Sequence, residues 1–153
     1  MDESTYLIRR PQNITPIEAA GVTSAAETAW QALFGHCCAG FEPGQTIFIN
    51  GGSSSVGAFA IQIAKAKGAA RVVASASGQN EEFVKSLGAD EFIDYTKQPL
   101  HEYLTQNPPS PKFHIIFDAV AVKDPILVHV QSCLPCAGWN FCFNWLNPRT
   151  SSL

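Results

Sequence analysis

The segment from residue 46 to residue 68 constrains the fold of this chain more than any other. It begins with a short apolar, β-branched run, Thr46 to Ile49, which is typical of a buried parallel strand. A turn of glycine and serine follows at 51–55. From Val56 apolar residues recur at helical spacing until Gly68, a residue that commonly ends helices. A strand, a small-residue turn and a helix in this order form the layout that binds dinucleotides.

The turn can approach a diphosphate closely because its residues have little side-chain bulk. We expect its backbone amides to face the phosphates from the helix N-terminus, where the helix dipole favours an anion. The candidate residues are Ser53, Ser54, Ser55, Val56 and Gly57. Read as G-x-G-x-x-G from Gly52, the sequence has Ser54 at the middle glycine, while Gly57 would allow close packing of helix on strand. The alternative is an ordinary strand-to-helix turn whose small residues serve packing alone.

The second predicted strand, at 71–76, bears on the choice of nucleotide. An NAD site usually has Asp or Glu at the end of this strand, where the carboxylate binds the ribose 2′-hydroxyl. Here the strand ends in uncharged residues from Ser77 to Asn80, and Glu81 begins the next helix. An uncharged, serine-containing end fits a 2′-phosphate better, so the sequence favours NADP over NAD. No Lys or Arg stands in this stretch, and turn or capping roles for Ser77 and Asn80 are an alternative.

Alternating strands and helices predict an α/β fold, a Rossmann-type doubly wound parallel sheet of about five strands with helices on both faces. The expected strands lie at 46–50, 71–76, 91–94, 113–117 and 139–143. Capping boxes at Thr15 and Ser24 predict two helix starts before the first strand. The expected organisation is a helical lead-in at 1–40, a Rossmann NADP-binding domain at 41–143, and a tail at 144–153 that matches no pattern.

Composition excludes several classes of protein. The 153 residues carry a net charge of −3, which gives no electrostatic footprint for nucleic acid. No apolar run is long enough to span a membrane, and the start lacks a signal-peptide pattern, so we expect a cytoplasmic protein. Five cysteines do not suggest a disulfide framework. Cys133 and Cys136 have no second pair, so reduced thiols are a simpler interpretation than a zinc site. The Tyr-x-x-x-Lys pair of short-chain reductases is absent.

Several segments in a fixed order resemble the medium-chain dehydrogenase/reductase superfamily, and in particular its quinone oxidoreductase and enoyl reductase branch, which includes fungal trans-acting enoyl reductases. These segments lie at 14–21, 28–33, 43–46, 85–90, 93–95 and 116–120. The resemblance covers roughly residues 5 to 140 and corresponds to the cofactor domain. It implies NADP(H) binding and hydride transfer to a quinone or a conjugated carbonyl.

The resemblance also implies roles for individual residues. It places Ser53 to Val56 on the pyrophosphate, Ser77 and Asn80 near the 2′-phosphate, and Tyr95 beside the adenine-ribose phosphate. Family members often have Lys or Arg near positions 79 and 80, where this sequence has Gln and Asn. An aromatic residue that simply closes a strand is the alternative for Tyr95.

Compared with the family, the chain lacks the N-terminal catalytic domain and the sixth strand, so we expect a truncated protein. The substrate pocket and any zinc would belong to the absent part, and we assign no catalytic residue or metal ligand. The implied partners are the nicotinamide cofactor, an unknown small-molecule substrate, and a second copy or the missing domain. The alternatives are a scaffold module that binds nucleotide without turnover and, less favoured, another nucleotide-binding domain such as a methyltransferase.

Overall fold

The central sheet has five parallel strands in the order β3-β2-β1-β4-β5. The structure, a computed structural model, describes residues 9–35 and 40–120, together with the backbone of 140–142. The strands are β1 (Thr46–Asn50), β2 (Arg71–Ala76), β3 (Glu91–Asp94), β4 (Ile115–Asp118) and β5 (Asn140–Cys142). The helices are α1 (Pro16–Phe34), α2 (Ser55–Ala66), α3 (Glu81–Ser86) and α4 (Leu100–Gln106), and a 3-10 turn, η2, spans Gly78–Asn80.

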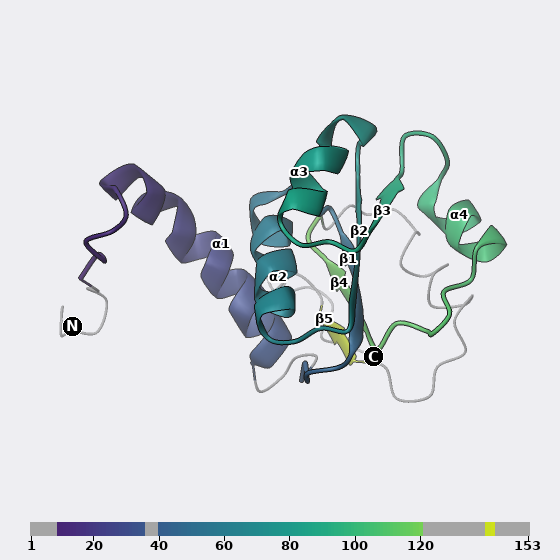
Figure 1. The fold of residues 1–153 in the computed structure, drawn as a ribbon, viewed down its shortest axis with the longest axis horizontal. Helices are drawn as coiled ribbons and strands as arrows, with labels where there is room; N and C mark the ends of the chain where they lie inside the picture. Colours follow the sequence, from purple (N-terminus) through teal and green to yellow (C-terminus); the bar gives the residue numbers. More distant parts are fainter. Residues whose placement is uncertain (1–8, 36–39, 121–139, 143–153) are drawn as a thin grey trace, which may run out of the picture.

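Helices cover both faces of the sheet. Figure 1 shows α1, α2 and α3 on one face and α4 on the other. The side chains of β1 alternate accordingly: Ile47 and Ile49 pack in the larger core under α1, α2 and α3, while Phe48 packs with Leu100 and Leu104 of α4. The doubly wound Rossmann-type fold expected from the sequence is therefore confirmed.

The capping boxes at Thr15 and Ser24 have different outcomes. At Thr15 the box is formed, since the Thr15 amide donates to Glu18 Oε2 at 2.7 Å and the Glu18 amide donates to Thr15 Oγ1 at 3.3 Å. The prediction that Ser24 begins a second helix is wrong. Ser24 lies inside the single helix α1, and its carbonyl accepts from Thr28 Oγ1 at 2.8 Å. Nothing between the two boxes stops the helix, because Gly21 alone is tolerated in a helix interior.

Smaller differences concern other element boundaries. The fourth strand begins at Ile115 rather than Phe113, although the Phe113 side chain is buried against Phe48 with 5.4 Å between ring centroids. The helix predicted from about residue 80 begins as the turn η2. The helix predicted at 124–133, the pair Cys133 and Cys136, and the tail 144–153 lie outside the described residues. No helix among the described ranges is both long and apolar enough to cross a membrane.

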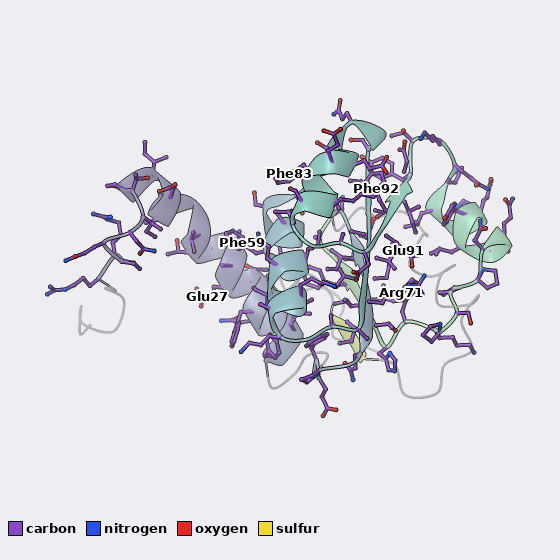
Figure 2. The ribbon with its side chains drawn as sticks, viewed as in Figure 1. Glu27, Phe59, Arg71, Phe83, Glu91 and Phe92 are labelled. Atoms are coloured by element: carbon purple, nitrogen blue, oxygen red, sulfur yellow. The ribbon has the colours of Figure 1, made fainter. Side chains whose placement is uncertain are left out.

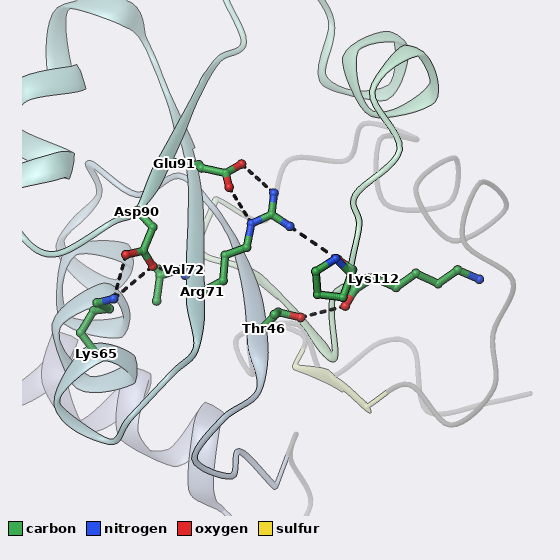
Figure 3. Close-up of polar contacts among 8 residues, drawn as sticks. Thr46, Lys65, Arg71, Val72, Asp90, Glu91 and Lys112 are labelled. Carbon is green, nitrogen blue, oxygen red and sulfur yellow. Dashed lines mark hydrogen bonds and ion pairs between the residues drawn. The ribbon is translucent and has the colours of Figure 1, made fainter.

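Ion pairs join the elements at the amino edge of the sheet (Figure 3). Arg71 donates from Nε and Nη2 to both carboxylate oxygens of Glu91, at 2.6 and 2.7 Å. In Figure 2 these two side chains point toward each other. Lys65 of α2 contacts both oxygens of Asp90, one of which also accepts from the Val72 amide at 2.7 Å. These contacts tie β3 to β2 and α2 at the edge opposite the glycine–serine turn.

Acidification is expected to reduce the contribution of the pair between Arg71 and Glu91. The hydrogen bond from Arg71 lowers the pKa of Glu91 below its ordinary value of 4.5. At pH values between the lowered pKa and the ordinary value, the unfolded chain binds more protons than the folded chain. The contribution of the pair to stability therefore rises with pH across this window and is absent below it. Because the Glu91 side chain is 51% exposed, we expect the pair to contribute less than about 1 kcal/mol to the free energy of unfolding. Urea unfolding of Glu91→Gln from about pH 6 to about pH 3 should show a weaker pH dependence than the original chain. An identical pH dependence would contradict this role.

Candidate functional site

The glycine–serine turn lies at the carboxyl edge of the sheet, directly after β1. The amides of Gly51 and Gly52 both donate to the Ser75 carbonyl of β2, at 3.0 and 2.8 Å, and the Ser54 amide donates to the Gly51 carbonyl at 2.9 Å. Gly51 has a φ of 78°, in the region that favours glycine. These bonds hold the turn against two strands, so its position is set by the sheet.

Two of the five predicted turn amides are used by the protein itself. Ser54 is the N-cap of α2, and its Oγ accepts from the Gly57 amide at 3.0 Å. Within the described ranges, the amides of Ser53, Ser55 and Val56 have no hydrogen-bond acceptor in the protein. Ser55 is exposed and the other two are half-buried. Ser55 and Val56 are the first two residues of a 12-residue helix and Ser53 directly precedes its N-cap, a place where an anion is favoured.

Gly57 allows α2 to contact the turn closely. A β-carbon at this position would overlap the Gly51 carbonyl oxygen and lie 2.9 Å from the Gly51 carbonyl carbon. Gly52 is also enclosed, since its β-carbon would lie 2.9 Å from that of Ala74. Gly57 therefore allows close packing of α2 on the turn that follows β1, where the sequence predicted close packing of the helix on the strand.

Behind the turn, a polar network crosses β2, β1 and β4. Contacts between its residues were not predicted from the sequence. Ser75 Oγ donates to Asn50 Oδ1 at 2.8 Å, and Asn50 Nδ2 donates to Asp118 Oδ1 at 2.9 Å. The Val120 amide donates to the same Asp118 oxygen at 3.1 Å. Ser75 and Asp118 are buried. The strand register pairs Asn50 with both Ser75 and Asp118. Each of these polar residues stands at or near the end of an apolar strand, and this pattern was the sequence signal that could have indicated the network.

The residues expected at the ribose end are close together. Asn80 Nδ2 donates to Ser77 Oγ at 2.8 Å, and the Tyr95 amide donates to the Ala76 carbonyl at 3.4 Å. Tyr95 directly follows β3 and is 49% exposed. Ser77, Asn80 and Tyr95 thus occupy adjoining positions at the carboxyl ends of β2 and β3.

The structure adds Asp94 to this end of the site. A β-carbon on Gly78 would overlap Asp94 Oδ2 and lie 3.1 Å from Asp94 Cγ. A hydrogen bond from the Thr96 hydroxyl, at 2.6 Å, helped by the Thr96 amide and by Lys97, holds the pKa of Asp94 below its ordinary value. The end of β2 carries no acid of its own, but the register pairs Ala76 with Asp94, which brings a carboxylate from β3.

The described residues contain no group of three His, Cys, Asp or Glu side chains placed to hold a metal ion. Cys133 and Cys136, which the sequence analysis considered for zinc, are not among those residues. The described part of the site has a set of backbone donors, a polar cluster at the carboxyl ends of β2 and β3, and a polar network behind the turn.

Comparison with known proteins shows the family of this chain. The family model for zinc-binding dehydrogenases matches residues 55–135. The chain belongs to this family, within the medium-chain dehydrogenase/reductase superfamily. The chain is 42% identical over 116 residues to the medium chain reductase pydE of Acremonium sp, covering 75% of this chain and 31% of that protein. It is 37% identical over 123 residues to the chloroplastic NADPH-dependent alkenal/one oxidoreductase of Arabidopsis thaliana, covering 80% of this chain and 30% of that protein.

Solved structures show the same relationship. The quinone oxidoreductase of Coxiella burnetii superposes with a TM-score of 0.70 at 31% identity, covering 83% of this chain and 37% of that chain. This chain therefore spans about a third of the length of the relatives it matches, and the matched part includes the cofactor domain.

Proposed function

We propose that this chain is the NADP(H)-binding domain of a quinone or enoyl reductase-like oxidoreductase. The observation that carries the proposal is the set of three amides, of Ser53, Ser55 and Val56, that have no acceptor in the described protein and lie at the start of α2. Such donors at a helix N-terminus, next to a turn without bulky side chains, fit the diphosphate of a dinucleotide.

The remaining site residues fit the same ligand. Ser77, Asn80 and Tyr95 would contact the adenine-ribose end, one strand away from the diphosphate. A bound nicotinamide would supply the hydride that passes to a conjugated carbonyl or a quinone. The chain's own contribution is to bind and orient the cofactor, and we assign it no proton donor or nucleophile. The NADPH-dependent relative from Arabidopsis supports the choice of cofactor.

Fluorescence titration of NADPH with the purified chain tests this proposal. We expect saturable enhancement of the nicotinamide emission and competition by a non-fluorescent dinucleotide, because both share the diphosphate. Absence of binding at about millimolar NADPH would mean a binding free energy weaker than about −4 kcal/mol and would contradict the proposed function.

A second candidate is a nucleotide-binding module that performs no turnover. It is favoured by the fact that the chain spans only about 30% of the Arabidopsis reductase. The two candidates differ in one assay: the purified chain is mixed with NADPH and an enone or a quinone. NADPH oxidation that depends on the added acceptor would exclude the non-catalytic module. A cytoplasmic location, and assembly with a second copy or another domain, stay predictions.

A further inference from the structure

The ribose end of the site needs a cation if it is to bind a 2′-phosphate, and the residues from Ser77 to Asn80 provide none. Most Lys and Arg side chains of the described ranges lie elsewhere. Lys65 and Lys67 end α2, Arg71 begins β2, and Lys112 precedes β4, so all four are near the amino edge. In the described segments that directly follow the carboxyl ends of the strands, Lys97 is the only basic residue.

Lys97 comes from the loop after β3, yet its ammonium group is near the end of β2. Its Nζ lies 3.5 Å from Asp94 Oδ2, which is the oxygen that a β-carbon on Gly78 would overlap. Gly78 itself lies between Ser77 and Asn80. A cation from a neighbouring loop is thereby brought to the stretch whose own sequence lacks one.

The contact between Lys97 and Asp94 is weak enough to be exchanged. Lys97 is 79% exposed, and 3.5 Å is long for a charged hydrogen bond. Asp94 does not depend on it, because the Thr96 amide and hydroxyl both donate to Asp94 Oδ1, at 3.0 and 2.6 Å. The ammonium can therefore move to a phosphate oxygen while the carboxylate keeps two donors.

An open hollow of about 380 Å³ adjoins this pair. Asp94 and Lys97 line it together with Glu81, Gln98 and Tyr103, whereas Ser77, Asn80 and Tyr95 do not, so it lies along β3 beside the ribose-end residues. The Glu81 carboxylate is already paired with Lys85, with 2.7 Å between Nζ and Oε1. Of the two carboxylates that line the hollow, only that of Asp94 then remains, and it would repel a phosphate if Lys97 were absent.

We propose that Lys97 binds the 2′-phosphate of NADP and is the residue that makes this site accept the phosphorylated dinucleotide. The inference rests on the proposed function and adds the specificity determinant. NAD(H) has no phosphate for Lys97 to bind, so its affinity should not depend on this side chain.

The test compares NADPH and NADH binding to three variants by fluorescence titration. Lys97→Gln removes the charge, Lys97→Arg keeps it, and Lys112→Gln is the control, another exposed lysine, which precedes β4 at the opposite edge of the sheet. We expect Lys97→Gln to weaken NADPH binding roughly tenfold or more, as expected for one lost charge-assisted hydrogen bond, with NADH binding unchanged. Lys97→Arg should bind NADPH nearly as well as the original chain, and Lys112→Gln should match the original chain for both dinucleotides.

Each other outcome counts against the inference. Unchanged NADPH binding by Lys97→Gln, or equal weakening of NADPH and NADH, would overturn the role of Lys97 and leave the proposed function standing. Failure of the original chain to bind either dinucleotide would overturn the proposed function and this inference together. Lys97 is too exposed for its replacement to unfold the chain, so the variants report on binding.

Discussion

Replacing Gly57 by alanine is expected to abolish dinucleotide binding and to lower the free energy of unfolding by about 1–3 kcal/mol. The added β-carbon would overlap the Gly51 carbonyl oxygen, a backbone atom that the turn cannot move freely because the Gly51 amide is bonded to Ser75. Relief requires α2 to move away from β1. That movement would displace the amides of Ser55 and Val56 and break the bond from the Gly57 amide to Ser54 Oγ.

Gly21→Ala is the matched control for this change. Gly21 is also a glycine inside a helix, but a β-carbon there would meet nothing within 4 Å. This control should stabilise the chain by about 0.5–1 kcal/mol, the ordinary gain for alanine in a helix, and leave NADPH binding unchanged. Urea unfolding and NADPH titration measure both effects. If Gly57→Ala bound NADPH like Gly21→Ala, close packing at the turn would not be required for binding.

Replacing Asp118 by alanine is expected to destabilise the chain by about 1–3 kcal/mol and to weaken dinucleotide binding. The change removes the oxygen that accepts from Asn50 Nδ2 and from the Val120 amide, and so leaves donors in a largely buried place without a partner. Asn50 would then lose its fixed orientation toward Ser75, whose carbonyl holds the two glycine amides of the turn.

Asp118→Asn separates the hydrogen bond from the rest of the side chain. It keeps an oxygen at the Oδ1 position, so it should retain most of the stability that alanine loses. Urea unfolding of both variants provides the comparison, with NADPH titration as the second readout. Equal stability of the alanine variant and the original chain would show that the network does not support the turn.

Much of the fold was predictable because the chain's local signals agree with its tertiary structure. The strands at 46–50, 71–76 and 91–94 have the bounds expected from their apolar runs and flanking turns. The capping box at Ser24 does not begin a helix, because such a motif can do so only where the preceding residues are not already helical. Periodicity cannot show that α1 continues through it.

The candidate site was predictable only in part. Position in the turn identified the residues around Ser53 to Val56, but not that the Ser54 hydroxyl and the Gly57 amide bind each other. Asp94 and Asp118 were not predicted near the turn and the end of β2, and neither was Lys97, which we propose for the 2′-phosphate. Asp94 and Asp118 come there through the pairing of β3 with β2 and of β4 with β1, and Lys97 follows in the loop after β3. The register of a sheet is not visible in any single segment.

The most direct test of the central claim is a nuclear magnetic resonance titration of ¹⁵N-labelled chain with NADPH, followed at the backbone amides of the turn. We expect the amide signals of Ser53, Ser55 and Val56 to shift and saturate together, and ADP-ribose, which retains the diphosphate, to shift them in the same way. Saturation of NADPH binding while these three signals stay in place would contradict the central claim.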